Sequence, residues 1–599
     1  IITGAEESQT PELLSLALGG NIPNVLNVNK TKIFDLLQGR LQSPNPQSEV
    51  YAILLTAACN HLHETFPFLF ESINDYTELL LPDDLLSGQS ILEDVRMAMT
   101  KGNCEEVEVI GWLYQFYISD KKDDVFGSKG KVKKEEIPAA TQLFTPRWIV
   151  EYMVQNTVGK LWVLNHPNSK LKDHMPYYIE SEVTAEDVLT IEKPEELTLL
   201  DQACGSGHIL VYGFELLYKI YEEEGYAPSD IPRLIIEHNL HGFEIDERAA
   251  QLAGLAILMK AREHQRRLFR KSDVPEPKIT CFEDLTLSDE ETKGTLKSLG
   301  VDYSDELLHD LQHMRQATNF GSLIVPHASL QEIQKAKTTC EQTMDSADLF
   351  EKEKLELLMI AFDTLKSLGT KVCCVVDNPP YLGGRKMNKS LSKLVRNEYC
   401  DSRSDLMASF IEAGHRSLLS NGLLGMINQQ SWMFLSSYSN LRNKLVSNIQ
   451  FDSLLHLGPK TFAEIGGEIV QNASFVILKN KPRYKCRFIQ LTEYSSQDLK
   501  RREALNAILN RSSIFYVCDQ RKFKKITGTV FGYWISEAFI SKFGNDEIIE
   551  KYFDVRQGLS TGDNDRFLRF WNEVEKRKLI FNNKNIDDAL EKSSGFVPH

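Results

Sequence analysis

The residues best suited to chemistry are Asn378-Pro379-Pro380-Tyr381, which follow an apolar run and Asp377. The side-chain carbonyl of Asn378 and the backbone carbonyl of Pro379 can accept both hydrogens of an amino group, which favours a pyramidal nitrogen with an available lone pair. The two prolines restrict the backbone and aim these carbonyls in advance. Tyr381 offers a ring for one extruded base, and such stacking contributes about 1–3 kcal/mol. The pattern predicts chemistry on the amine of a nucleobase or on an amide; a proline turn that only closes a strand is the alternative.

A glycine-rich loop provides the second group of candidate residues. A buried strand is expected from Leu197 to Leu200, and it runs into Asp201-Gln202-Ala203-Cys204-Gly205-Ser206-Gly207-His208 and then into an apolar helix. Glycines let the backbone approach a ligand, and ligands of open α/β sheets bind at the carboxyl ends of strands. Leu210 replaces the third glycine of a dinucleotide fingerprint, which disfavours a nicotinamide cofactor. Glu244 ends a second expected strand, where a carboxylate can accept both hydroxyls of a ribose.

Together the glycine loop, the ribose acid and the Asn-Pro-Pro-Tyr strand end resemble the motifs of S-adenosylmethionine-dependent amino-methyltransferases. The resemblance implies an α/β fold with a doubly wound, Rossmann-like sheet and S-adenosylmethionine as the cofactor. Gln142-Leu143-Phe144-Thr145-Pro146 resembles the Phe-Thr-Pro segment that these enzymes place over the methionine end of the cofactor. Ile279 to Leu285 resembles the third motif, with Asp284 as the acid that approaches the adenine of the cofactor.

Two later segments continue the resemblance. Asp405 to Asn428 is similar to the next helix and strand of the family, and Phe462 stands where the family has a second aromatic beside the target base. A core position is the alternative for Phe462. The order of the motifs resembles the gamma group of DNA adenine-N6 methyltransferases. Asn378 at the first catalytic position favours adenine over cytosine-N4, although the same hydrogen bonds serve either amine.

The resemblance assigns three sets of residues. The catalytic set is Asn378, Pro379, Pro380 and Tyr381. The cofactor-binding set is Phe144, Thr145, Pro146, Asp201, Ala203, Cys204, Gly205, Gly207, Glu244, Ile245, Asp284 and Asn378. The substrate-binding set is Tyr381, Phe462, Arg385 and Lys386.

Three further stretches narrow the resemblance to one family. They are Glu108 to Tyr117, Asn378 to Asn388 including Leu382-Gly383-Gly384-Arg385-Lys386-Met387, and Gln557 to Phe567. They resemble the PglX family of adenine methyltransferases from bacterial BREX phage-defence systems. The resemblance implies site-specific methylation of double-stranded DNA that marks the host, together with partner proteins of the BREX system.

The elements that must position these motifs divide the chain into three predicted parts. Helical spacing over 1–136 predicts a helical N-terminal domain, and strand and helix alternation over 137–479 predicts the methyltransferase domain. An insertion from about 288 to 368 is rich in charge and helix formers, and it could clamp DNA or dock a partner. Residues 480–599 are expected to be a linker and the beginning of a C-terminal DNA-recognition region. Because the sequence starts at Ile1 and stops soon after this region begins, we expect it to be part of a longer protein.

Composition limits the remaining possibilities. A chain of 599 residues with 42% apolar content can form several cores. It has no apolar stretch of membrane-spanning length and no secretory signal pattern, so we expect a soluble, cytoplasmic protein without a membrane partner. The ten cysteines include no Cys-x-x-Cys pair, and we interpret them as small residues in a reducing compartment. No metal site is predicted.

The net charge of −16 argues against DNA wrapping over the whole surface, because phosphate binding relies on Lys and Arg. Local basic stretches can still contact DNA. The candidates are Arg385, Lys386 and Lys389, the stretch Lys129 to Lys134, and Lys481 to Arg487 with Arg521 to Lys525. For most of them a solvated face is the alternative. Arg385 and Lys386 are favoured because they follow the catalytic turn directly.

Two other functions remain open at this point. Enzymes that methylate RNA bases or protein glutamine use a similar Asn-Pro-Pro-Tyr site, because an amide nitrogen has the same delocalised lone pair. A catalytically silent scaffold that holds DNA or defence proteins is the other alternative, and the complete set of motifs argues against it.

Overall fold

The computed structural model describes residues 12–67, 130–141, 143–270, 274–462 and 470–544, together with scattered positions between 69 and 125. The chain divides into two compact units, Ile1–Ile535 and Ser536–His599. In the second unit the description covers a short helix, α22 (Glu537–Ile540), and a 3-10 turn after it. Gln557 to Phe567, Gln142 and most of Glu108 to Tyr117 lie outside the described residues.

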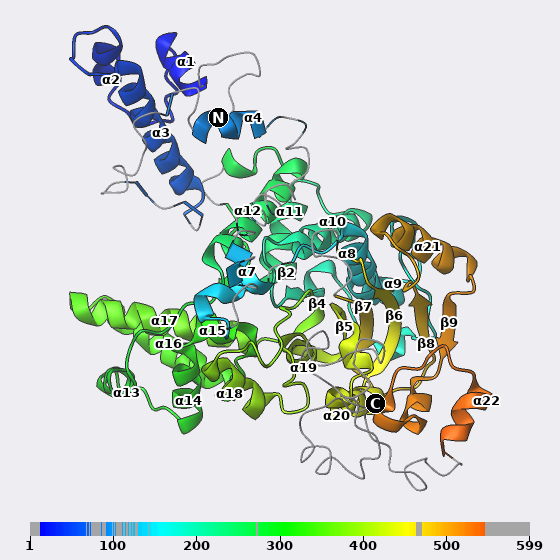
Figure 1. Cartoon of the computed structure of the whole chain (residues 1–599). Coiled ribbons are helices and arrows are strands. Elements are labelled where there is room, and N and C mark those ends of the chain that lie inside the picture. Colours follow the sequence, from blue (N-terminus) through cyan, green and yellow to red (C-terminus); the bar gives the residue numbers. More distant parts are fainter. Residues whose placement is uncertain are drawn as a thin grey trace, which may run out of the picture. The chain divides into compact units, whose positions relative to one another are not determined.

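A nine-stranded sheet runs through the first unit in the order β3-β2-β1-β4-β5-β7-β6-β8-β9 (Figure 1). The first five strands pair in parallel, whereas β7 lies antiparallel to both β5 and β6. Beyond them β8 pairs in parallel with β6, and β9 is antiparallel to β8. The strands are β1 (Leu199–Asp201), β2 (Leu240–Glu244), β3 (Lys278–Cys281), β4 (Val372–Asp377), β5 (Leu418–Gln429), β6 (Gln450–Gly458), β7 (Asn472–Leu478), β8 (Cys486–Gln490) and β9 (Phe515–Cys518).

The strand order changes direction between β1 and β4. From β1 the chain adds β2 and β3 on one side, then returns to add β4 and β5 on the other. Side chains and loops at the carboxyl ends of these two strands diverge to opposite sides, which leaves a crevice at this point of an open α/β sheet. The sheet therefore brings the ends of the two motif-bearing strands, Asp201 and Asp377, to one place.

Helices cover both faces of the sheet, because successive side chains of a strand point to opposite faces. Leu199 and Cys374 belong to the apolar cluster formed with α8 (Arg147–Val154) and α10 (His208–Glu223). Their neighbours Leu200 and Val375 belong to the cluster formed with α17, α19 and α20. These helices are α17 (Leu349–Gly369), α19 (Leu406–Ser417) and α20 (Ser439–Asn448). This arrangement confirms the predicted doubly wound α/β fold.

The remaining helices form the N-terminal part, the insertion and the flanks of the sheet. The N-terminal part has α1 (Glu12–Leu18), α2 (Lys30–Leu37) and α3 (Pro46–Thr65), which share an apolar cluster, and also α4 (Ile91–Ala98). The insertion has α13 (Asp289–Ser298), α14 (Asp305–Met314), α15 (Ala317–Phe320) and α16 (Leu330–Met344) before α17. The others are α7 (Ile137–Thr141), α9 (Lys160–Asn165), α11 (Ile231–Leu234), α12 (Glu247–His264), α18 (Lys389–Glu398) and α21 (Gln497–Asn510).

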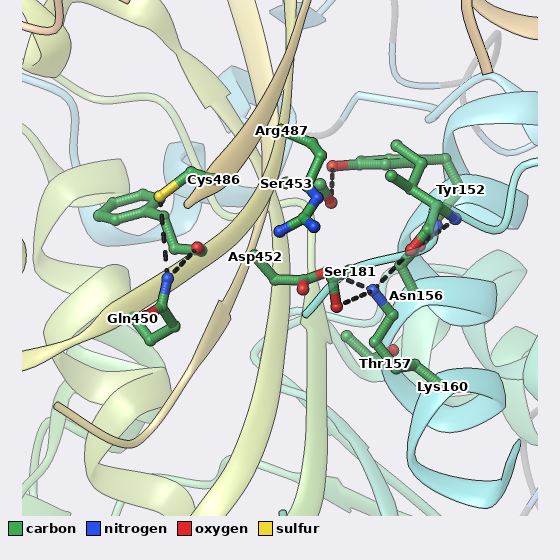
Figure 2. A network of polar contacts seen from close by, with 12 residues as sticks. Tyr152, Asn156, Thr157, Lys160, Ser181, Gln450, Asp452, Ser453, Cys486 and Arg487 are labelled. Carbon is green, nitrogen blue, oxygen red and sulfur yellow. Dashed lines mark hydrogen bonds and ion pairs between the residues drawn. The ribbon is translucent and has the colours of Figure 1, made fainter. Parts of the chain in front are cut away.

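A buried ion pair joins α9 to strand β6 (Figure 2). The Lys160 ammonium lies 2.5 Å from an Asp452 carboxylate oxygen, and both side chains are 1% exposed. Lys160 also donates to the Ile179 carbonyl at 2.8 Å, and burial lowers the pKa of its ammonium. The segment between α8 and α9, a π-helical turn over Gln155–Gly159, adds further buried hydrogen bonds. Asn156 donates to the Tyr177 carbonyl at 2.7 Å and accepts from the Ile179 amide at 2.8 Å.

The predicted strands and helices agree with these elements, including α19 and β5 in the segment from Asp405 to Asn428. The sheet continues past residue 479 through β8 and β9, and the predicted domain limits stay a prediction. Among the described helices, none has the length and apolar composition that a bilayer crossing requires. Every described cysteine is a free thiol, and most are buried.

Removing one charge of the Lys160–Asp452 pair is expected to destabilise the protein. Lys160→Met leaves a buried carboxylate without its cation, which costs about 3–5 kcal/mol, whereas the double variant Lys160→Met/Asp452→Leu recovers most of the loss. The matched control is Lys172→Met, because Lys172 forms an exposed pair with Glu180 at 2.7 Å and such pairs contribute about 0–1 kcal/mol. Urea unfolding of the four proteins measures the differences. Equal losses for Lys160→Met and Lys172→Met would contradict the expectation.

Candidate cofactor and amino-group site

One pocket lies at the carboxyl ends of β1, β2 and β4. Gly205, Glu244 and Asn378 line it together, so the predicted cofactor loop, ribose acid and catalytic turn face a common cavity. They come from three segments, and Gly205 and Asn378 are 173 residues apart in the sequence. The strand order explains the meeting, because β1 lies between β2 and β4.

The glycine loop takes a backbone shape that only glycine adopts freely. Gly205 has a φ of 53° and Gly207 a φ of 84°, both in the left-handed region. A Cβ on Gly207 would also come within 3.0 Å of the Ala253 backbone on α12. The loop is held by the Cys204 amide, which donates to the Phe243 carbonyl at 3.0 Å. These constraints keep the loop backbone close to the pocket.

The Glu244 carboxylate is fixed by three backbone amides. Gly205 donates to Oε2 at 2.8 Å, while Ile245 and Asp246 donate to Oε1 at 2.9 and 3.0 Å. Burial nevertheless raises the pKa of Glu244 to about 7, against the effect of these bonds. The group is thus poised between its neutral and ionised forms near neutral pH.

Two more carboxyl groups stand at the ends of neighbouring strands. Asp201 ends β1 and Asp377 ends β4, and each accepts one backbone amide, from Ala203 at 3.1 Å and from Gln202 at 2.7 Å. Burial, reinforced by the charge of Asp377, raises the pKa of Asp201 well above its usual value. Burial raises the pKa of Asp377 to about 8. Two adjacent buried carboxyls cannot both ionise easily, so a proton is retained there at neutral pH.

The side-chain amide of Asn378 has a fixed orientation. Its Nδ2 donates to the Leu143 carbonyl at 3.0 Å and to Thr145 Oγ1 at 2.9 Å. Its Oδ1 is buried and has no hydrogen-bond partner within the described part of the chain. Because an unpaired buried acceptor is costly, this oxygen is a candidate to receive a hydrogen from a ligand. The segment that contains Leu143 and Thr145 therefore orients the Asn378 amide.

Tyr381 lies outside the lining of this pocket, at the ends of β5 and β7. Its hydroxyl donates to the Ile427 carbonyl at 3.2 Å and accepts from Asn472 Nδ2 at 3.3 Å. These bonds hold the ring in place, next to Pro380, which does line the pocket. As a residue Tyr381 is half-buried, and it directly follows the lining residue Pro380 in the sequence.

Most predicted cofactor-binding residues line the pocket, but three do not. Those that do are Phe144, Thr145, Asp201, Ala203, Cys204, Gly205, Glu244, Ile245 and Asn378. Pro146, Gly207 and Asp284 are not part of the lining. Asp284 instead pairs with Lys134 at 2.6 Å and accepts from the Thr318 amide at 2.9 Å. Phe462 is 6% exposed within the apolar cluster of α8 and α10. The roles assigned to these residues stay predictions.

The insertion supplies a wall of the pocket that the sequence did not indicate. Asn319 to Leu323 belong to the pocket lining. Gly321, with a φ of 51°, approaches Ile245 so closely that a Cβ would meet the Ile245 side chain at 2.8 Å. Ser322 donates to the Gln202 carbonyl at 2.5 Å, and Asn388 donates to Asn319 at 2.7 Å. No motif marks this segment, and a lone glycine among charged helices is a weak signal.

The lining includes further residues that were not predicted. Phe282 follows β3, and Ile137, Pro138 and Thr141 belong to α7. Gly111 also lines the pocket, and Tyr114 donates its hydroxyl proton to Asp246 at 2.8 Å. These two residues belong to the stretch from Glu108 to Tyr117 that carried part of the family resemblance.

Two of the predicted basic stretches meet beside the catalytic turn. The Val132 amide donates to the Lys386 carbonyl at 2.9 Å, so the linker after residue 130 runs along the turn that holds Arg385. Arg385, Lys131 and Lys133 are exposed. We call these four residues, Lys131, Lys133, Arg385 and Lys386, the basic rim.

Comparison with known proteins gives related sequences over most of the chain. The profile of the Eco57I restriction-modification methylase family matches residues 238–462. The adenine-specific methyltransferase BrxX of Escherichia coli O9:H4 is 40% identical over 89% of this chain and 46% of its own length. The adenine-specific methyltransferase PglX of Lacticaseibacillus casei is 33% identical over 90% of this chain and 46% of its own length. The chain thus spans a little less than half the length of both relatives.

Among solved structures, the DNA-bound Type ISP restriction-modification enzyme LlaBIII aligns with 84% of this chain and 30% of its own, at 14% identity and a TM-score of 0.41. The Type IIL enzyme MmeI in complex with DNA aligns with 81% and 58%, at 15% identity and a TM-score of 0.40.

Binding of S-adenosylmethionine, the cofactor predicted from the sequence, is expected to strengthen several-fold from about pH 6 to about pH 8. Free Glu244 holds a proton below its pKa of about 7, whereas a cationic ligand with ribose hydroxyls favours the carboxylate. Binding therefore releases a proton, and affinity rises with pH through this window. Calorimetric titration across the range measures it. The Glu244→Gln protein should bind the cofactor more weakly and lose the part of the pH dependence centred near pH 7. An unchanged dependence of affinity on pH in this variant would exclude Glu244 as the titrating group.

Proposed function

The chain belongs to the PglX family of adenine-specific methyltransferases, and on this basis we propose that it carries the catalytic core of a site-specific DNA adenine-N6 methyltransferase. We propose S-adenosylmethionine as the methyl donor and double-stranded DNA as the substrate. The proposal extends to a role in a BREX phage-defence system, in which methylation marks host DNA and other BREX proteins are partners. The activity of the whole protein is proposed because the chain spans less than half of its relatives.

The orphaned acceptor on Asn378 carries the proposal. A pocket lined by the glycine loop and by Glu244, whose pKa is about 7, suits a nucleoside cofactor. These two features alone do not suggest methylation of an amine. A buried carbonyl oxygen without a partner among the described residues, in that same pocket, is suited to receive an N–H group. Its orientation is fixed by Leu143 and Thr145 before any substrate binds. Such preorganisation favours the transition state because no side chain has to reorient.

The residues present fit S-adenosylmethionine at one end of this pocket. Glu244 would accept the ribose hydroxyls, the loop from Cys204 to Gly205 would pass along the cofactor, and Asp201 would face its cationic part. Phe144, which stacks near His208 with ring centroids 4.3 Å apart, would cover the methionine end. When bound, the cofactor supplies a methyl group on a sulfonium, which is an excellent leaving group.

The amine is activated by the chain alone. Asn378 Oδ1 and the Pro379 carbonyl accept the two N6 hydrogens, which localises the nitrogen lone pair. As the N6–carbon bond forms, the nitrogen becomes cationic and acidic, and one of its protons leaves to water or to an adjacent carbonyl. No strong general base is required, and Asp377, whose pKa of about 8 keeps it largely protonated at neutral pH, need not ionise.

The target adenine must leave the duplex to reach this pocket. Tyr381 would stack on the extruded base, because its hydroxyl is tied to β5 and β7 and its ring stands beside Pro380. The basic rim would contact phosphates next to the flipped nucleotide. This local positive charge reconciles DNA binding with a chain whose net charge is −16.

Asn378→Ala is expected to lower the rate of methyl transfer to DNA by about a hundredfold or more, because the transition state loses a preorganised acceptor. Cofactor affinity should change little. Thr145→Val removes one of the two acceptors that orient Asn378, so a smaller loss of rate is expected. Thr364→Val is the matched control, since among the described residues the Thr364 hydroxyl bonds only to the Ile360 carbonyl within α17. Incorporation of labelled methyl into DNA, with sequencing for N6-methyladenine, measures the rate.

The same assay separates the alternatives. Methylation of RNA or protein in place of DNA would support an RNA or glutamine methyltransferase. Cofactor or DNA binding without transfer, in the full-length protein with its partners, would indicate a silent scaffold. Full activity of the Asn378→Ala protein would refute the assignment of the site.

Arg385→Ala is expected to weaken DNA binding uniformly across sequences and to lower the slope of log K against log salt by about one unit, as the loss of one phosphate contact does. Fluorescence anisotropy at several salt concentrations measures the slope. Arg502→Ala on α21 is the control, because Arg502 is exposed and pairs only with the adjacent Glu503 in the described contacts. An identical slope in the wild-type and Arg385→Ala proteins would remove Arg385 from the DNA interface.

A further inference from the structure

A cluster of histidines and one buried acid lies in the insertion, outside the lining of the pocket. His309 and Asp310 are on α14, and His327 is in the segment that leads to α16. Their ligand atoms, one from each residue, all lie within 4.8 Å of one another. His309 Nδ1 is 3.7 Å and His327 Nδ1 is 3.2 Å from the same oxygen, Oδ1 of Asp310. The sequence predicted no metal site, because these residues form no recognisable spacing.

We propose that His309, Asp310 and His327 bind a divalent transition-metal ion of the zinc type. Around a tetrahedral zinc with bonds of about 2.1 Å, ligand atoms stand about 3.4 Å apart. The distances from Asp310 Oδ1 to His327 Nδ1 and His309 Nδ1, 3.2 and 3.7 Å, lie on either side of this value. Two imidazole nitrogens select such an ion over Mg²⁺ or Ca²⁺, which prefer sets of oxygen ligands.

The backbone around Asp310 orients its carboxylate as a metal ligand. The side chain of Asp310 is fully buried, and within the described part of the chain its ion-pair partners are the two histidines alone. Its other oxygen, Oδ2, accepts the amides of His327 and Ala328 at 2.8 Å each, which directs Oδ1 toward the imidazoles. A buried carboxylate requires a compensating cation, and a bound metal ion supplies one.

Two further groups, His313 and Glu398, lie beside the proposed ligands. His313 lies one helical turn after His309, with ring centroids 4.3 Å apart, and its Nδ1 is buried without a hydrogen-bond partner among the described residues. It lies beside the three proposed ligands but is not part of the group whose ligand atoms lie within 4.8 Å of one another. Glu398 Oε2 stands 4.0 Å from His327 Nε2, where a carboxylate can orient a metal-bound imidazole through its second nitrogen.

The metal ion would join the two ends of the segment that contains the pocket-lining residues 319–323. Asp310 and His327 flank the segment from Asn319 to Leu323, so their joint ligation would close a loop around it and restrict its motion. On the premise of the proposed function, metal binding should therefore strengthen cofactor binding. The metal site itself does not depend on that premise, because ion binding is measured without cofactor or DNA.

The test uses the full 599-residue chain, stripped with a chelator and then titrated with Zn²⁺ or Co²⁺. We expect one ion per chain for the wild-type protein, and binding at least about 100-fold weaker for the double variant His309→Ala/His327→Ala. This variant keeps Asp310, which accepts the backbone amides of residues 327 and 328. His174→Ala, on an exposed 3-10 turn, is the matched control and should bind as the wild type does. The Co²⁺ spectrum should lack thiolate charge-transfer bands, which distinguishes the site from the exposed Cys400.

Circular dichroism without metal checks that each variant is folded. Zn²⁺ should raise the melting temperature of the wild-type and His174→Ala proteins but not that of the double variant. Equal zinc affinity in wild-type and double-variant proteins, or no binding by a folded wild type, would overturn the proposal. Loss of zinc binding in the double variant with unchanged cofactor affinity would support the site and refute its coupling to the pocket.

Discussion

The hydrogen bonds from Asn378 Nδ2 to Leu143 and Thr145 hold together the part of the structure on which the proposed chemistry depends. An asparagine amide can turn over and exchange its donor for its acceptor, with little change in shape. The Leu143 carbonyl at Nδ2 opposes this, because a carbonyl can only accept and the reversed amide would set its oxygen against the carbonyl oxygen. The segment before α8 thus determines which atom of Asn378 meets a ligand. These hydrogen bonds join a Phe-Thr-Pro segment and an Asn-Pro-Pro-Tyr turn that are over 230 residues apart.

Charge burial is the second organising constraint. The carboxyls of Asp201, Glu244 and Asp377 gather where three strands end, and burial raises the pKa of each. The cost of keeping them there is lowered by backbone amides and by retained protons. In the described part of the chain none of the three pairs with an arginine. Binding of a cationic cofactor would favour loss of a proton from these carboxyls, so the negative charge of the site would increase on binding. Elsewhere, the pairing of Lys160 with Asp452 fixes the helices that precede β1 onto the far strands of the sheet.

Local signals were sufficient to predict the strands that carry motifs. The glycine loop needed left-handed residues, and Gly205 and Gly207 supply them; the apolar run before Asp377 forms β4. What the sequence did not indicate depends on distant partners. Asp284 is engaged by Lys134, and the pocket wall from Asn319 to Leu323 comes from a helical insertion without a motif. Gln155, Asn156 and Lys160 are polar residues that patterning assigns to a surface, but the fold buries them because the segment around Tyr177 to Ile179 offers hydrogen-bond partners.

The close approach of Gly321 to Ile245 limits how the insertion can vary. Its base is a structural part of the pocket, since Ser322 is bonded to Gln202 and Asn319 to Asn388. The turn between α16 and α17, over residues 345–348, has no such ties to the pocket lining. Additions or deletions of sequence should therefore be tolerated at that turn, whereas shortening near residue 320 would open the pocket to solvent. The insertion can therefore be lengthened at its outer turn, but deleting it entirely would remove part of the pocket lining.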